Sequence, residues 1–148
     1  MNEPVSYEQY LQEHGTLTYT NVGVSMLPLL RQGKDLFIVK RKGPQRCAAG
    51  DVVLYRRPPD KYVLHRIIEV RDDSYVILGD NCTEKEYGIR DDDILGVMTG
   101  FVRNGREHST EDAGYRLYTS FWMHTIGFRR ALLKGKAKLR RLIKRIVG

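Results

Sequence analysis

Three side chains in this sequence have the types that nucleophilic catalysis requires, in the order Ser25, His65 and Asp80. A serine hydroxyl is a weak nucleophile, so it needs a base to take its proton, and that base needs an acceptor to orient it. We predict Ser25 as the nucleophile, His65 as the general base, and Asp80 as the carboxylate that holds the imidazole and stabilises its charged form. Such a set would carry out acyl transfer.

Ser25 lies in an apolar stretch, Gly-Val-Ser-Met-Leu-Pro-Leu-Leu, from residue 23 to residue 30. Proline is tolerated in the first turn of a helix, so Pro28 favours a helix with Ser25 as its N-cap. Backbone N–H groups at a helix start have no partner within the helix and can hold a developing oxyanion. We predict that those of Ser25 and Met26 do so; the alternative is that Ser25 only caps a helix.

His65 and Asp80 each have a simpler explanation. A lone histidine in a strand is often a structural residue, and Asp80 stands in a Gly-Asp-Asn segment, where aspartate commonly serves turn geometry alone. Asp51, which follows Gly50, is interpreted in that way, as a turn residue that braces a sheet. The order and spacing of the segments taken together favour a catalytic site over these separate explanations.

Short runs of β-forming residues separated by turns indicate an antiparallel β fold, because no helix between them is long enough for a parallel crossover. The predicted strands span residues 17–22, 36–39, 52–55, 62–70, 75–78 and 94–103. In the strand 62–70, alternation puts His65 on one face with Val63 and Ile67, and Arg66 on the other. Helices are expected over residues 7–13, over 115–126 and after Gly127.

We therefore expect a mainly β domain at residues 1–108, including the short N-terminal helix, and a helical region at 109–148 that is basic from 127. The net charge is +7, yet nine Lys or Arg and no acid fall within 127–148, and removing those nine leaves residues 1–126 at −2. Apolar residues recur at helical spacing among these cations, which predicts an amphipathic helix; they are Leu132, Leu139, Leu142, Ile143 and Ile146.

Three partners suit a cationic amphipathic helix: an anionic membrane surface, the phosphates of a nucleic acid, or the body of the protein itself. We favour peripheral contact with a membrane through residues 127–148 and do not expect nucleic acid as the partner. No apolar run approaches the ~20 residues that a membrane-spanning helix needs. The N-terminus lacks the features of a secretory signal, so we expect a cytoplasmic protein with Cys47 and Cys82 as reduced thiols.

Four segments, in this order, resemble the S24/S26 serine peptidase superfamily, which includes signal peptidases and the self-cleaving LexA-type repressors. They are Ser-Met-x-Pro at 25–28, Gly-Asp at 50–51, His-Arg at 65–66, and Gly-Asp-Asn at 79–81 followed by Ile-x-Gly at 94–96. The resemblance covers residues 19–100. It implies an antiparallel β core of the LexA and signal peptidase type, a serine nucleophile, and cleavage of a peptide or protein substrate without a metal or other cofactor.

Bacterial signal peptidases and LexA-type proteins use lysine as the base, whereas another branch has histidine before the arginine, as at His65 here. Lys61 ranks below His65, because the motif match gives it no role. The resemblance also implies an extended peptide bound along a strand edge. Met26, Leu27 and Leu29 are the expected lining of that groove, with ordinary core packing of the three as the alternative.

The resemblance also rests on a second Gly-Asp type box, which reads Gly-Lys-Asp at 33–35 where family members often have Gly-Asp. The sequence departs from the family pattern there and in three other respects. Gly23 stands where signal peptidases usually carry a Ser or Thr that contributes to the oxyanion hole, so backbone N–H groups must serve alone. The acid that orients His65 can be Asp80 or one of Asp91, Asp92 and Asp93, and the sequence does not choose. Signal peptidases are anchored by a membrane-spanning helix, which is not expected here.

The sequence thus predicts a serine endopeptidase that processes signal or leader peptides. One alternative is a self-cleaving regulatory protein of the LexA type, although about 20 residues before the fold are too few for a helix-turn-helix domain. The other is a non-catalytic peptide-binding module on the same fold. A histidine base predicts activity that falls as acid protonates it near pH ~6.5.

Overall fold

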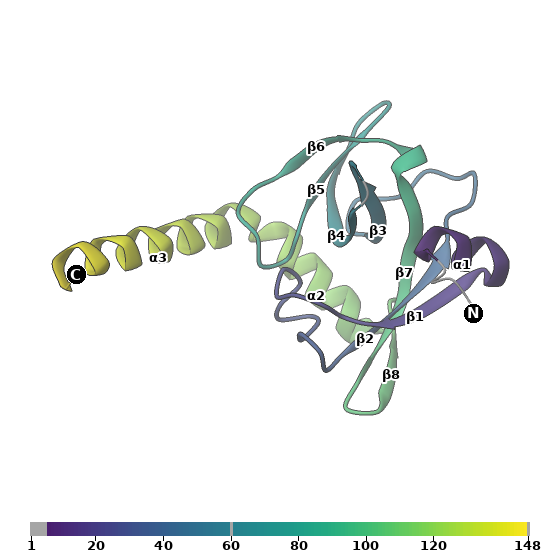
Figure 1. The fold of residues 1–148 in the computed structure, drawn as a ribbon, viewed down its shortest axis with the longest axis horizontal. Coiled ribbons are helices and arrows are strands. Elements are labelled where there is room, and N and C mark those ends of the chain that lie inside the picture. Colours follow the sequence, from purple (N-terminus) through teal and green to yellow (C-terminus); the bar gives the residue numbers. More distant parts are fainter. Residues whose placement is uncertain (1–5, 60, 148) are drawn as a thin grey trace.

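An antiparallel β sheet, with one helix before it and two after it, makes up the fold in a computed structural model that describes residues 6–59 and 61–147 (Figure 1). The elements in chain order are α1 (Tyr7–His14), β1 (Thr16–Thr20), β2 (Leu36–Arg41), β3 (Val52–Arg57), β4 (Lys61–Val70), β5 (Tyr75–Leu78), β6 (Glu86–Ile89), the 3₁₀ helix η1 (Asp91–Asp93), β7 (Ile94–Arg103), β8 (Arg106–Ser109), α2 (Ala113–His124) and α3 (Ile126–Val147). The mainly β fold with C-terminal helices is as predicted.

The strands lie in the order β1-β2-β7-β3-β4-β5-β6, with β8 paired to β7, and all the pairs are antiparallel. Strand β4 lies between β3 and β5, and His65 of β4 pairs with Val53 of β3. Predicted and observed strands differ by a few residues at most, and 94–103 agrees at both ends with β7. Strands β6 and β8 were not predicted: each is four residues long, β6 has Gly88 in its interior, and β8 consists of polar residues.

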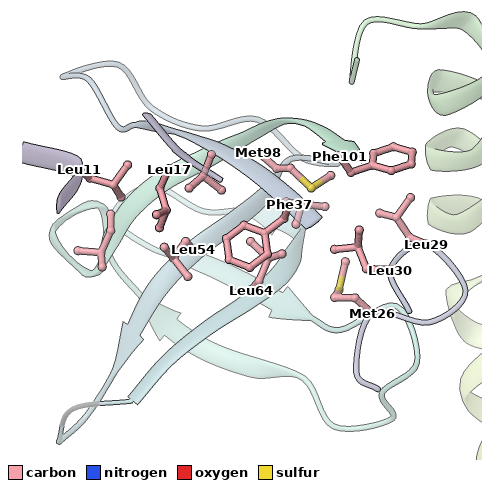
Figure 2. Close-up of a cluster of buried hydrophobic side chains, with 13 residues drawn as sticks. Leu11, Leu17, Met26, Leu29, Leu30, Phe37, Leu54, Leu64, Met98 and Phe101 are labelled. Carbon is pink, nitrogen blue, oxygen red and sulfur yellow. The ribbon is translucent and has the colours of Figure 1, made fainter. Parts of the chain in front are cut away.

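Two clusters of buried side chains pack on opposite faces of the sheet. The first cluster contains Leu11, Leu17, Met26, Leu29, Leu30, Phe37, Val39, Val52, Leu54, Leu64, Leu95, Met98 and Phe101. The second contains Cys47, Val53, Tyr55, Ile67, Tyr75, Ile77, Ile89 and Ile94. Strand β3 is buried on both faces, because alternate residues of a strand point in opposite directions and feed both clusters. In Figure 2, Met26, Leu29 and Leu30 lie at one end of the first cluster and Leu11 at the other.

Helix α1, which was predicted over residues 7–13, has a capping residue at each end. The Ser6 hydroxyl accepts a hydrogen bond from the N–H of Gln9 at 3.1 Å, which is the usual N-cap contact. Gly15 ends the helix in the left-handed conformation at φ 78°, and its N–H donates to the carbonyl of Leu11. Leu11 is the buried residue of this helix, so α1 packs onto the first cluster.

The two C-terminal helices differ in their surroundings. Tyr115 and Tyr118 of α2 pack against the first cluster, whereas α3 extends from the body of the molecule (Figure 1). The predicted helix 115–126 begins two residues earlier, at Ala113, and a break at Thr125 separates it from α3. None of the helices in the described residues combines the length and apolar character needed to cross a bilayer.

Candidate active site

Ser25 lies in a turn between β1 and β2, not at the start of a helix as predicted. The turn is closed by hydrogen bonds from the N–H of Leu27 to the carbonyl of Val24, at 3.2 Å, and from the N–H of Leu30 to that of Met26, at 3.0 Å. Within the described residues, the N–H groups of Ser25 and Met26 make no hydrogen bond. Both therefore remain available as donors, although no helix presents them.

The turn after β5 holds the Ser25 loop in place. The backbone N–H of Asn81 donates to the carbonyl of Ser25 at 2.8 Å, and the Asn81 side chain donates to the carbonyl of Val24 at 3.1 Å. The sequence interpretation gave Asn81 only a turn role. In the structure it ties two segments together that are more than fifty residues apart.

Gly79 lies beside both the backbone carbonyl of Ser25 and the imidazole of His65. A Cβ atom placed on Gly79 would lie 2.9 Å from the carbonyl oxygen of Ser25, 3.0 Å from Cδ2 of His65 and 2.6 Å from Sγ of Cys82. The carbonyl of Ser25 and the imidazole edge of His65 therefore lie within 3.0 Å of one point. Glycine is required there because contacts this short leave no room for a side chain. Cδ2 is bonded to Nε2, so this edge of the imidazole carries the nitrogen that a general base would use.

The other ring nitrogen of His65 is held by Tyr55. Nδ1 lies 3.2 Å from the Tyr55 hydroxyl, which donates its proton to Oε1 of Glu86 at 2.9 Å. A hydroxyl has one proton, so the Tyr55 oxygen accepts from Nδ1–H, and this leaves the lone pair of the neutral imidazole on Nε2. Glu86 also pairs with Arg57. The chain of hydrogen bonds from His65 through Tyr55 to Glu86 thus assigns the tautomer with its proton on Nδ1. This is the tautomer that a general base acting through Nε2 needs.

Burial governs the charge of His65, whose exposed fraction is 8%. Desolvation lowers its pKa to about 4, and the charge of Arg57 acts in the same direction, while Glu86 and Asp80 partly oppose it. The imidazole is therefore neutral near pH 7 and can accept a proton. Burial, and then the charge of Glu86, raise the pKa of the Tyr55 hydroxyl, which keeps it protonated as a donor.

Asp80 does not occupy the position that the sequence predicted beside His65. Its two carboxylate oxygens bind Nε and Nη2 of Arg66, at 2.8 Å and 2.9 Å, and the Tyr118 hydroxyl donates to it at 2.8 Å. Arg66 is on the face of β4 opposite His65, as the alternation predicted, so its partner lies on that side as well. The contact expected from Asp80 is made instead by Tyr55.

Two of the three acids of η1 bind partners other than His65. Asp91 accepts a hydrogen bond from the Tyr75 hydroxyl and pairs with Lys42 and Arg46, each at 3.3 Å. Asp93 accepts from the N–H of Arg90 at 2.9 Å. The acid connected to His65 is Glu86 of β6, a strand that the sequence analysis missed. Tyr55 was predicted only as a strand residue, although a buried tyrosine needs a partner for its hydroxyl.

The expected groove residues are mostly core residues. Met26 and Leu29 have exposed fractions of 1% and 5% and belong to the first cluster, while Leu27 is half-buried. The packing alternative is therefore correct for Met26 and Leu29. Met26 and Leu29, which follow the serine, anchor the Ser25 turn in the core.

A cavity of about 1190 Å³ lies where the groove is needed, and both Ser25 and His65 line it. Lys61 is also in its wall, four residues from His65 in the same strand. Helix α3 also lines the cavity, through Leu133, Lys136, Ala137 and Arg140. The helical region thus contributes to the cavity that holds the candidate catalytic pair.

The four segments that carry the family resemblance meet around β4. Nη1 of Arg66 donates to the carbonyl of Gly50 at 2.8 Å, and the N–H of Ile67 donates to the carbonyl of Asp51 at 2.8 Å. The Asp51 carboxylate accepts from the N–H of Ala48 at 2.9 Å, which agrees with the turn role predicted for it.

Among the described residues, no three His, Cys, Asp or Glu side chains are grouped so that they could hold a metal ion. Comparisons with protein-family models, curated proteins and solved structures give no match.

Proposed function

We propose that this chain is a serine endopeptidase that cleaves a peptide bond through an acyl-enzyme on Ser25, with His65 as the general base. The observation that carries the proposal is the shared position beside Gly79, where the Ser25 backbone and the Nε2 edge of His65 are both within 3.0 Å of one point. The neutral, oriented imidazole and the open cavity support it.

The proposed reaction has two half-reactions. Nε2 of His65 takes the proton of Ser25 as Oγ attacks the scissile carbonyl, and the N–H groups of Ser25 and Met26 stabilise the oxyanion. The C–N bond then breaks, and the imidazolium gives its proton to the leaving amine. Water attacks the acyl-enzyme, its proton passes through His65 to Oγ of Ser25, and the carboxylic acid is released.

We further propose that the β core is of the LexA and signal peptidase type and that the substrates are signal or leader peptides. Support comes from the meeting of residues 25–28, 50–51, 65–66 and 79–81 around β4, since these are the segments that carry the resemblance. An extended peptide fits a cavity whose wall includes the first half of β4.

A serine-directed fluorophosphonate probe tests the chemistry. Wild type should be labelled and Ser25→Ala should not, while His65→Gln should react at least about a thousandfold more slowly. Lys61→Ala and Cys82→Ala are the matched controls, because both residues line the same cavity, and each should label at the wild-type rate. Burial raises the pKa of the Cys82 thiol, so this group is a poor nucleophile at neutral pH.

Several outcomes would overturn the proposal. Labelling that survives Ser25→Ala excludes the assigned nucleophile, and labelling lost with Lys61→Ala but kept with His65→Gln excludes the assigned base. An unlabelled wild type that still binds peptides would indicate the non-catalytic module. An internal cut in purified wild type, absent from Ser25→Ala, would retain the chemistry but indicate a self-cleaving protein.

A further inference from the structure

One face of α3 exposes a continuous row of apolar side chains. The row recurs at intervals of mostly three, four or seven residues and consists of Phe128, Leu132, Leu139, Leu142, Ile143 and Ile146. Their exposed fractions run from 49% to 76%, and α3 projects from the β body (Figure 1). We call these six residues the apolar stripe. A continuous exposed stripe of this kind in a soluble monomer marks an interaction surface.

All the charged residues of α3 are cationic. Nine Lys or Arg and no acid occur from residue 127 to residue 148. Arg129 and Arg130 donate to backbone carbonyls of the turn after β5, those of Asp80 and Thr83, at 3.0 Å and 2.7 Å. Among the described residues, the other seven cations form no ion pair. They are Lys134, Lys136, Lys138, Arg140, Arg141, Lys144 and Arg145.

We propose that α3 binds the surface of a bilayer that contains anionic lipids, with the apolar stripe in the headgroup region and the cations among the headgroups. An apolar face bordered by Lys and Arg is the composition of helices that lie in the membrane interface. Charge complementarity selects this occupant. A second copy of α3 would bring two sets of cations together, and nucleic acid would leave the apolar stripe exposed to water.

Binding in this orientation would place the cavity beside the lipid surface. The apolar stripe lies on one side of α3, while Leu133, Lys136, Ala137 and Arg140 on another side line the cavity with Ser25 and His65. The bonds from Arg129 and Arg130 fix the start of the helix against the β body. If the proposed function holds, peptides cleaved by this enzyme emerge from or lie on that surface.

Vesicle co-sedimentation of the full chain tests the docking. Vesicles of phosphatidylcholine with phosphatidylglycerol should bind the wild type at least tenfold more tightly than phosphatidylcholine alone, and added salt should weaken binding. The double variant Leu139→Ser with Leu142→Ser should bind about tenfold more weakly, because it removes apolar area and no charge. The matched control is Ala131→Ser with Ala137→Ser on the same helix, which should bind within about twofold of wild type.

Ser25→Ala should bind vesicles like the wild type, so the result does not depend on the proposed chemistry. Circular dichroism checks that each variant keeps its helix content. The proposal is overturned if the leucine variant binds as tightly as the wild type, or if neutral and anionic vesicles bind equally. Binding to double-stranded DNA without binding to anionic vesicles would also overturn it.

Discussion

Arg66 binds both carboxylate oxygens of Asp80, and the side chains of this ion pair are each 1% exposed. The pair is also the attachment point of the C-terminal helices, since Tyr118 donates to the Asp80 carboxylate and Trp122 to its carbonyl. Asp80 thus connects the sheet to α2 and stands one residue from Gly79. Its role in the structure is to position the turn after β5, which contacts the Ser25 loop.

Asp80→Asn should destabilise the fold by about 3 to 5 kcal/mol, because it leaves the Arg66 charge buried without a counter-ion. Urea unfolding measures the loss, and Asp73→Asn, at an exposed turn position, is the control that should change it by less than about 0.5 kcal/mol. An Asp80→Asn variant of normal stability with a large loss of kcat would contradict this assignment and restore the sequence-based role beside His65.

Tyr55→Phe should lower kcat by up to about a hundredfold with little change in KM, because His65 loses the hydrogen bond that orients it. Tyr75→Phe is the matched control: both tyrosines are fully buried in the second cluster and bond through their hydroxyls, but Tyr75 contacts Cys47 and Asp91. Both variants should lose about 1 to 3 kcal/mol of stability. Equal kcat values in the two variants would exclude Tyr55 as a positioning residue.

Burial sets the pH range over which His65 is neutral and can act as a base. The pKa of His65 is about 4 in the folded protein and ~6.5 when unfolded, so the unfolded state binds more protons between these values. Stability should be complete above pH ~6.5 and fall by up to about 3 kcal/mol as pH drops towards 4. Activity limited by His65 should persist to about pH 4, well below the midpoint near pH ~6.5 that an unperturbed histidine predicts.

Unfolding curves across this pH range check the assignment. His65→Gln should remove most of the slope between pH ~6.5 and 4, and His124→Gln, at an exposed helix end, should keep it. A stability profile that is flat over this range in the wild type would show that His65 is solvated.

Gly79→Ala should reduce kcat strongly and cost about 1 to 3 kcal/mol of stability, because the added methyl meets the Ser25 carbonyl at 2.9 Å and His65 at 3.0 Å. Gly43→Ala is the control, since a Cβ there meets nothing within 4 Å. Measuring kcat and the free energy of unfolding for both variants separates an effect on the site from a general loss of stability. Wild-type activity in Gly79→Ala would mean that the Ser25 loop and His65 are not held together at this turn.

Local patterns were enough to predict most of the elements but not the polar partners. Alternation placed His65 and Arg66 on opposite faces of β4, and the interpretation of Asp51 as a turn residue agrees with its bond to Ala48. The partner of His65 was missed because Tyr55 reaches Glu86 across 31 residues, and Glu86 begins a strand of only four residues with a glycine in its interior. The helix expected after Ser25 is a turn because Met26 and Leu29 enter the core there.

Residues 79–83 connect two parts of the chain that are distant in sequence. They hold the Ser25 loop through Asn81 on one side and receive Arg129 and Arg130 of α3 on the other. Truncation after residue 109 would therefore remove the contacts of α3 with the same turn that holds the Ser25 loop.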